Sequence, residues 1–343
     1  MTVPGEDIEE DIENLVSVVI PARNEEHYIG ACLDSIRAQE HELLQVIVVD
    51  GASTDDTVAV VNKHTAEDNR VELLRNPRRT IPVSMNMGLA HARGRWLVRV
   101  DAHSVVPPTY VAMALRRLQE GSWGGVGGRK DGVGVTSAGR AIAAAMGSRF
   151  GVGNSTYHHG TSPQEVDHIP FGAYPVALLR SLHGWDEGLV ANEDYELDYR
   201  LRQAGSRLLF DPQIAIRWHC RQSIGDLYRQ YRRYGQGKVD VALLHPASLS
   251  VRHLVPPALV AYVGVAALAA AVKRSPVLPL GMLAPYGLAV GAATASVGRT
   301  LGSSRERKWV APAFVAMHVG WGLGFWTGLA QTAARRVRGG QHR

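Results

Sequence analysis

Short apolar runs that alternate with helical patterns are the feature that most constrains this chain. Residues 15–20, 46–49, 71–74 and 95–100 are mainly apolar runs of strand length, separated by segments with helical spacing. Apolar runs of this kind are typical of strands that are buried on both faces of a parallel sheet. Strand and helix alternate four times, which predicts a doubly wound α/β domain with a mostly parallel sheet.

Acidic residues follow three of these runs. Glu25 comes shortly after the first run, Asp50 ends the second, and Asp101 follows the fourth. In doubly wound sheets, ligands bind beyond the carboxyl ends of the strands, so we expect these acids on one rim. Neither a GxGxxG fingerprint nor a GxxxxGK[ST] loop follows the first strand. The first absence argues against a dinucleotide-binding fold, and the second excludes a P-loop.

Asp101 and His103 form a candidate metal site. They stand one residue apart at the end of residues 95–100, which we expect to be a buried strand. Residues i and i+2 of a strand share a face, so both side chains could point at the same object. A carboxylate with an imidazole suits a divalent cation such as Mn²⁺ or Mg²⁺. The alternative is a polar transition from strand to loop that binds nothing.

Four ordered segments carry a resemblance to a known family. They are residues 19–25 (VIPARNE), 48–55 (VVDGASTD), 86–90 (NMGLA) and 101–103 (DAH). Together they resemble family 2 glycosyltransferases with a GT-A fold, and most closely the membrane-associated branch linked to succinoglycan-type exopolysaccharide synthesis. The resemblance implies a nucleotide-sugar donor.

The same resemblance assigns roles around the predicted rim. It implies that Pro21, Ala22, Glu25 and Asp50 line the base and ribose of the donor, with Asp50 accepting from an NH of the base. Asp101 would also lie at the nucleotide-sugar. The family's metal motif is Asp-x-Asp, and in this sequence a histidine replaces the second acid. The implied Mn²⁺ or Mg²⁺ site is therefore Asp101 with His103.

Residues 192–201 (NEDYELDYRL) predict a helix with acids in its first turn. The helix macrodipole favours acids at that end, so a plain helix start is the alternative reading, and we prefer it for Glu196 and Asp198. The flanking residues 184–189 (GWDEGL) complete a pattern that resembles the family's acceptor-site Glu-Asp motif.

In inverting members of the family, the Asp of that motif is the general base. The resemblance therefore implies that Asp194, with Glu193 beside it, carries the catalysis. Asp194 would take the proton of an acceptor hydroxyl as the oxygen attacks the anomeric carbon.

Residues 227–237 (LYRQYRRYGQG) interleave tyrosines with arginines. Such a pattern suits nucleic acid or an interfacial helix. Within it, Gln230, Arg233 and Tyr234 resemble the Gln-x-x-Arg-Trp segment of membrane-associated family members, which implies contacts with the diphosphate and the acceptor. Because apolar segments follow directly, we favour the membrane reading and expect no nucleic-acid partner. His219 is a possible third metal or diphosphate contact, or a surface histidine.

Residues 254–272, 277–297 and 311–330 carry no charged side chain, over 19, 21 and 20 residues. These lengths match a bilayer core of about 30 Å, and buried core helices are the alternative. We expect a multi-pass protein of the cell (inner) membrane with its catalytic domain in the cytoplasm. With three full spans, the basic tail would lie outside, partly against the positive-inside tendency. Either one segment is re-entrant or interfacial, or the sequence overrides the rule.

The sequence thus predicts three regions: an acidic flexible N-terminus at 1–13, a GT-A domain at 14–240, and a membrane region with a basic tail at 241–343. The predicted activity is inverting, metal-assisted transfer of one sugar from a nucleotide-diphosphate sugar, with a UDP-sugar favoured. The predicted acceptor is a lipid-linked saccharide or an exopolysaccharide. The alternatives are a non-catalytic membrane scaffold and a nucleotidyltransferase. The latter would need a basic, glycine-rich loop that residues 21–26 do not provide.

Overall fold

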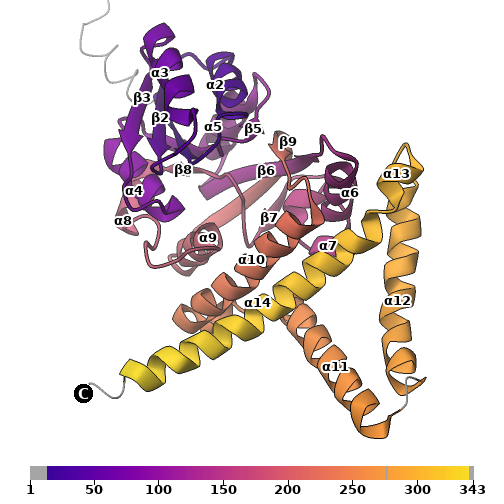
Figure 1. The fold of residues 1–343 in the computed structure, drawn as a ribbon. Coiled ribbons are helices and arrows are strands. Elements are labelled where there is room, and N and C mark those ends of the chain that lie inside the picture. The colour runs from indigo at the N-terminus through magenta and orange to yellow at the C-terminus, as the bar shows by residue number, and fades with distance from the viewer. Residues whose placement is uncertain (1–13, 275–276, 340–343) are drawn as a thin grey trace, which may run out of the picture. The chain divides into compact units, whose positions relative to one another are not determined.

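The computed structural model describes residues 14–274 and 277–339, so the acidic N-terminus at 1–13 lies outside the described residues (Figure 1). The chain divides into two compact units. The first contains residues up to Asp131 together with His159–Trp218, and the second contains Gly132–His158 together with the chain from His219 onward. The predicted boundary near residue 240 stays a prediction.

The first unit contains a mixed sheet, with strands in the order β3-β2-β1-β4-β8-β6-β9-β5 and β7 paired with β9. In the parallel half, β1 pairs with β2 and β4, and β2 pairs with β3. In the other half, β8 is antiparallel to β4 and β6, and β9 is antiparallel to β5 and β7. The strands are β1 (Val16–Ala22), β2 (Leu44–Asp50), β3 (Val71–Arg75), β4 (Trp96–Arg99), β5 (Ser104–Val105), β6 (Trp123–Val133), β7 (Gln164–Val166), β8 (Ala173–Pro175) and β9 (Arg207–His219).

Helices cover this sheet because the predicted strands are apolar on both faces. All seven residues of β2 are buried, which is the pattern expected of a central parallel strand. Gly88 on α4 sits directly against Val19 of β1, where a Cβ would collide with the valine side chain. The helices of this unit are α2 (Ile29–Arg37), α3 (Thr57–Glu67), α4 (Ile81–His91), α5 (Tyr110–Glu120), α8 (Val176–Ser181) and α9 (Glu193–Gln203).

The structure corrects the sequence prediction at the end of the fourth strand. β4 ends at Arg99, and the chain then turns, with the Ser104 N–H donating to the Asp101 carbonyl oxygen at 3.0 Å. Asp101 and His103 therefore do not alternate along a strand, and the argument that they share a strand face is wrong. A smaller correction is that β1 continues through Pro21, which stands opposite Val49, and ends at Ala22.

The second unit is helical among its described residues, apart from the ends of β6 and β9. Three of its helices are long and apolar enough to cross a membrane: Val251–Lys273, Leu280–Gly298 and Ser304–Arg335, with mean hydropathies of 2.0, 1.4 and 1.2. They overlap the three predicted spans. The elements are α6 (Ser137–Met146), α7 (Arg149–Val152), η1 (Thr156–His158), α10 (Ile224–Leu244), η2 (Pro246–Ser248), α11 (Val251–Lys273), α12 (Val277–Gly298), α13 (Ser304–Arg307) and α14 (Val310–Gly339).

Glycines hold α14 against α10, and Figure 1 shows the two helices side by side. Gly320, Gly324 and Gly328 recur every four residues, so they form one ridge of α14. A Cβ at each of them would press on the backbone of α10, at Tyr228, Arg232 and Gln236 respectively. Small residues let helix backbones approach closely, which is a recurrent means of packing in membranes.

We expect Gly324→Leu to separate α10 from α14, because a Cβ at Gly324 would collide with the Arg232 carbonyl oxygen. Overpacking of this kind costs about 1–3 kcal/mol or more. The matched control is Gly291→Leu on α12, where nothing lies within 4 Å of the added Cβ. Thermal unfolding in detergent should show a clearly lower Tm for Gly324→Leu alone. Equal Tm values for the two variants would contradict the packing described.

Candidate active site

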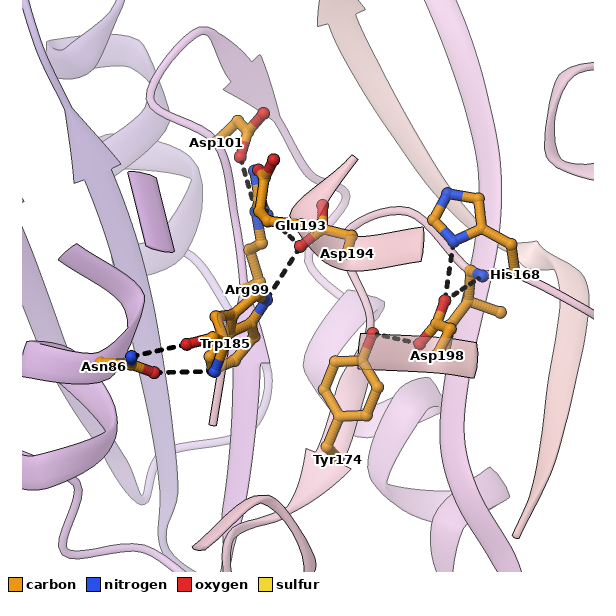
Figure 2. A network of polar contacts seen from close by, with 10 residues as sticks. Asn86, Arg99, Asp101, His168, Tyr174, Trp185, Glu193, Asp194 and Asp198 are labelled. Carbon is orange, nitrogen blue, oxygen red and sulfur yellow. Dashed lines mark hydrogen bonds and ion pairs between the residues drawn. The ribbon is translucent and has the colours of Figure 1, made fainter. Parts of the chain in front are cut away.

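Arg99, the last residue of β4, is a buried cation in contact with three carboxylates. Only 5% of its side chain is exposed, and its Nε donates to Asp101 Oδ1 at 3.0 Å. Its Nη1 pairs with Asp194 and lies 3.5 Å from Glu193 Oε1. Figure 2 shows the guanidinium between Asp101 and the start of α9. The Arg99 side chain therefore contacts both Asp101, the predicted metal ligand, and the acidic pair Glu193–Asp194, which contains the predicted general base.

Burial and charge act in opposite directions within this cluster. Burial alone would lower the pKa of Arg99, but Asp101, Asp194 and Glu193 raise it well above its usual value, so Arg99 stays charged. Burial would raise the pKa of Asp101, but Arg99, His103 and Lys130 bring it below its usual value. Burial, followed by the charge of Asp194, raises the pKa of Glu193 to about 7.

A second set of contacts directs Asp194 from the other side. The Trp185 indole Nε1 donates to Asp194 Oδ1 at 3.0 Å. Asn86 of α4 fixes the backbone of Trp185 twice, because its Nδ2 donates to the Trp185 carbonyl oxygen and its Oδ1 accepts from the Trp185 N–H, both at 2.8 Å. Figure 2 shows both Asn86 bonds. Asp194 is thus held by two donors, Arg99 and Trp185, and Asn86 holds the second of them in place.

One turn further along α9, Asp198 anchors the helix. Its carboxylate is fully buried, takes the Ile169 N–H at 2.8 Å and the Tyr174 hydroxyl at 3.1 Å, and lies 2.7 Å from His168 Nδ1 (Figure 2). The sequence suggested only a plain helix start for Asp198. Its partners lie 24 to 30 residues away, so no local pattern indicates them. Glu196 has the structural role expected, in an ion pair with Arg200 at 2.7 Å.

The predicted nucleoside residues lie at the end of β1 (Pro21 and Ala22), in the turn after it (Glu25) and at the end of β2 (Asp50). Asp50 is buried at the end of β2 and accepts from the Ser53 N–H at 3.2 Å, while the Gly51 N–H donates to the Ala22 carbonyl oxygen at 2.7 Å. That bond joins the two turns. Asn24 and Ala52 have φ values of 56° and 55°, a left-handed backbone that costs a non-glycine residue free energy. Strain of this kind clusters at ligand sites.

Glu25, unlike the other predicted nucleoside residues, contacts the candidate metal ligand His103. Its Oε1 lies 2.9 Å from His103 Nδ1, so the carboxylate reaches the turn after β4. Glu25 thus joins His103 to the first turn of the domain. Asp101 and His103 remain the candidate metal ligands, and no group of three or more His, Cys, Asp or Glu side chains among the described residues could hold an ion alone.

Two donors of this kind still fit a divalent cation that is shared with a substrate. Mg²⁺ is commonly bound by one or two protein ligands together with phosphate oxygens and water. The carboxylate of Asp101 and the imidazole of His103 would supply the protein part. The arrangement fits an ion that binds with a diphosphate better than one that is bound beforehand.

The remaining predicted residues belong to the second unit. Gln230 is buried on α10 and donates from Nε2 to the Tyr234 hydroxyl oxygen at 2.9 Å, while Arg233 is exposed. His219 stands at the end of β9. Their part in a site with Asp194 stays a prediction.

Sequence reasoning missed Arg99, Trp185 and Asn86 as site residues. A signal for Arg99 was available, because an arginine inside an otherwise apolar strand must find counter-charges when the strand is buried. Trp185 lies within segment 184–189 and Asn86 within segment 86–90, but neither segment indicates that Trp185 contacts Asp194 or that Asn86 bonds to Trp185.

Replacing Arg99 with Met should destabilise the protein strongly, because the buried Glu193 and the largely buried Asp101 and Asp194 would lose their cation. Removing one partner of a buried ion pair typically costs about 3–5 kcal/mol. The matched control is Arg93→Met, which removes a surface pair with Glu72 whose arginine side chain is 65% exposed. Such pairs are worth about 0–1 kcal/mol. Chemical denaturation in detergent should separate the two variants clearly, and equal losses would contradict the role given to Arg99.

Glu193→Gln should change the pH dependence of stability. With a pKa of about 7 against an ordinary 4.5, folded Glu193 keeps a proton that the unfolded chain has lost. The contribution of Glu193 to the free energy of unfolding therefore falls as the pH rises from about 4.5 to 7, and the glutamine variant lacks this pH-dependent contribution. The Tm of the variant relative to wild type should rise between pH 5 and pH 8.

Glu67→Gln is the matched control for that measurement. The Glu67 side chain is exposed, so its replacement removes a carboxylate from the surface and not from the interior. A Tm difference for Glu193→Gln that stays constant between pH 5 and pH 8 would show that Glu193 is not held in the environment described.

Comparison with known proteins supports one family. Residues 17–180 match the model for "Glycosyl transferase family 2". The chain is 31% identical to the succinoglycan biosynthesis protein ExoA of Rhizobium meliloti, over 90% of this chain and 93% of that protein. It is 24% identical to a dolichyl N-acetyl-alpha-D-glucosaminyl phosphate 3-beta-D-2,3-diacetamido-2,3-dideoxy-beta-D-glucuronosyltransferase of Methanococcus voltae, over 66% of this chain and 73% of that one.

A solved structure shares the fold. The mannosyltransferase PcManGT from Pyrobaculum calidifontis, determined with GDP-Man and Mn²⁺, aligns with a TM-score of 0.61 at 21% identity. The alignment covers 89% of this chain and 86% of that one. The fold prediction is therefore confirmed as a GT-A-like domain followed by apolar helices. The ExoA relative, together with the family model, shows that this protein is an enzyme of glycosyltransferase family 2.

Proposed function

We propose that this enzyme transfers one sugar, with inversion, from a nucleoside-diphosphate sugar to a membrane-associated acceptor. The observation that carries the proposal is the contact of Arg99 with both Asp101 and Asp194. It joins the turn that faces a donor diphosphate to the acid that faces an acceptor hydroxyl. An inverting transfer needs these two functions on opposite sides of one anomeric carbon.

Asp194 is the base in this proposal. As the acceptor oxygen attacks the anomeric carbon, its proton passes to the Asp194 carboxylate, and the bond from that carbon to the diphosphate oxygen breaks. Arg99 and the Trp185 indole hold the carboxylate in one orientation. A base must stand within hydrogen-bond reach of the proton it accepts, so fixing its direction contributes to the rate. Glu193 next to it completes the acidic pair.

Asp101 and His103 are the residues that would hold a Mn²⁺ or Mg²⁺ ion, with His219 as a further candidate. When bound, such an ion neutralises charge on the departing diphosphate. The PcManGT structure, in complex with GDP-Man and Mn²⁺, supports a divalent cation here. Glu25 orients His103 through the 2.9 Å contact with its Nδ1, which favours one tautomer of the ring.

The donor nucleoside is assigned to the turns after β1 and β2, with Pro21, Ala22, Glu25 and Asp50 as its neighbours. The close connection between these turns at Gly51 supports one shared binding surface. We favour a UDP-sugar, while the GDP-Man of PcManGT makes a GDP-sugar the first competitor. Gln230, Arg233 and Tyr234 of α10 are proposed to contact the diphosphate and the acceptor.

The proposed setting is the cytoplasmic face of the inner membrane, with several spans. The candidate spans on α11, α12 and α14 support it, as does packing of α10 against α14. The proposed acceptor is a lipid-linked saccharide or an exopolysaccharide. The names of the two sequence relatives, one in succinoglycan biosynthesis and one acting on a dolichyl-linked sugar, support an acceptor of this kind.

Asp194→Asn should slow transfer strongly while leaving donor binding nearly unchanged, because only the proton acceptor is lost. General-base catalysis contributes about 100-fold to 10,000-fold, and the loss should lie in that range. Detergent-purified protein is incubated with UDP-, GDP- or dTDP-sugars, Mn²⁺ or Mg²⁺ and a membrane lipid extract, and sugar entering the lipid fraction is counted.

Asp34→Asn, on the exposed surface of α2, is the control and should transfer at the wild-type rate. If Asp194→Asn transfers sugar at the wild-type rate, Asp194 is not the general base. If the wild-type enzyme transfers sugar at an unchanged rate in excess chelator, the ion proposed at Asp101 and His103 is not needed for the reaction.

A further inference from the structure

The connection between the second and third candidate spans carries four exposed cations. Residues 299–309 join α12 to α14, and the cations among them are Arg299, Arg305, Arg307 and Lys308. We call these four residues the cationic face. The connection also contains one acid, Glu306, but only 12% of its side chain is exposed. The exposed charge of this connection is therefore positive.

Glu306 pairs with a residue of another helix instead of with these cations. Its Oε1 accepts from the Arg140 Nε at 2.6 Å, and the Arg140 Nη1 donates to the Val135 carbonyl oxygen at 2.8 Å. Arg140 belongs to α6, and Figure 1 shows α13, which carries Glu306, next to that helix. Within the part of the chain that the structure describes, no residue of the cationic face forms an ion pair with an acid.

Local packing gathers the cations at one end of the two spans. The Arg307 Nη2 donates to the Leu301 carbonyl oxygen at 3.1 Å, and a Cβ at Gly298 would lie 3.7 Å from the Arg307 Cγ. Arg307 thus packs on the end of α12, next to the position of Arg299. At the other end of the connection, the Lys308 Nζ lies 5.4 Å from the centroid of the Trp309 ring. Tryptophan with a basic neighbour, at the end of an apolar helix, suits the headgroup level of a bilayer.

Three of the cations stand where a helix favours acids. Arg305, Arg307 and Lys308 lie in the first turns of the third candidate span, Ser304–Arg335. The helix macrodipole places partial positive charge at this end, so cations there are unfavourable unless an anion lies near them. Only Arg299, which follows the end of α12, stands where the macrodipole favours a cation. Helix stability therefore does not account for the cationic face, whereas an external anion would.

We propose that the cationic face binds the headgroups of anionic phospholipids. The connection lies between two candidate spans, Leu280–Gly298 and Ser304–Arg335, and only 6% of the apolar window of the first is buried within the chain. Spans that face lipid in this way would present the connection at the membrane surface. Clusters of Lys and Arg next to a span attract anionic lipid through their combined charge. The inference rests on the proposed membrane setting and is independent of the proposed reaction.

The test follows thermal unfolding of the detergent-purified full chain in micelles that contain increasing fractions of phosphatidylglycerol or phosphatidylcholine. A lipid that binds only the folded protein raises its Tm, and the lipid fraction that gives half of the increase reports the affinity. The triple variant combines Arg299→Gln, Arg305→Gln and Lys308→Gln. Arg307 is left in place because it bonds to the backbone of the connection.

The matched control combines Lys63→Gln, Arg75→Gln and Arg217→Gln. These three cations are exposed on the first unit, so the control loses the same charge as the triple variant at another surface. Two further arms use the wild-type chain. One replaces the lipid with inorganic phosphate, and the other repeats the phosphatidylglycerol titration in about 1 M salt, where the Debye length falls to about 3 Å.

Phosphatidylglycerol should raise the Tm of the wild-type chain, and phosphatidylcholine and inorganic phosphate should not. The triple variant should need about 10-fold more phosphatidylglycerol for half of the increase, as expected for the loss of three surface cations. The control should behave like wild type, and high salt should shift the wild-type titration in the same direction as the triple variant. Similar Tm values for the variant and wild type without lipid would show that the variant is folded.

Equal titrations of wild type and the triple variant would overturn the inference, and so would a wild-type Tm that phosphatidylglycerol does not raise. An equal effect of phosphatidylcholine would show that the headgroup charge is not recognised, and an equal effect of inorganic phosphate would show a phosphate site instead of a lipid surface. If the triple variant unfolds early without lipid, the salt arm decides, because a wild-type titration that salt does not change contradicts the proposal. A wild-type chain that stays monomeric after the detergent is removed would contradict the membrane setting itself and leave the proposed reaction standing.

Discussion

The ion pairs of Arg99 are the interaction on which the rest of the first unit depends. Three carboxylates within one buried region would repel one another and lose their hydration, and each would then take up a proton. A single guanidinium, itself only 5% exposed, offsets this cost for Asp101, Glu193 and Asp194. Although burial would raise the pKa of Asp101, the charges of Arg99, His103 and Lys130 bring it below its usual value, whereas burial and the charge of Asp194 raise the pKa of Glu193 to about 7.

Close backbone approaches at glycine place the other parts of the molecule. Gly88 brings α4, which carries Asn86, against β1, and Gly128 brings β6 against β9. In the second unit, the ridge of Gly320, Gly324 and Gly328 holds α14 along α10. In each case a side chain would occupy the space in which the neighbouring element lies. Glycine thus allows α4, β6 and α14 to lie close to the elements they pack against.

The sequence predicted the parallel half of the sheet well, since strands buried on both faces leave uninterrupted apolar runs such as that of β2. Because the ends of these runs are clear in the sequence, the acids at or after the ends of β1, β2 and β4 could be identified as well. The turn at Asp101 was not predictable, because its geometry depends on Ser104 and the short strand β5. The contacts of Asp198 and the Asn86–Trp185 bonds join distant segments, and no local spacing encodes such pairs.

The central claim is that Asp194 acts as a single base opposite a departing diphosphate. The most direct measurement is the anomeric configuration of the product. A donor with a ¹³C-labelled, α-linked sugar is incubated with the enzyme and a membrane lipid extract, and the one-bond C1–H1 coupling of the extracted product is read by NMR. One displacement assisted by one base inverts the centre, so the account predicts a β-linked product. An α-linked product would require a different mechanism and would contradict the account.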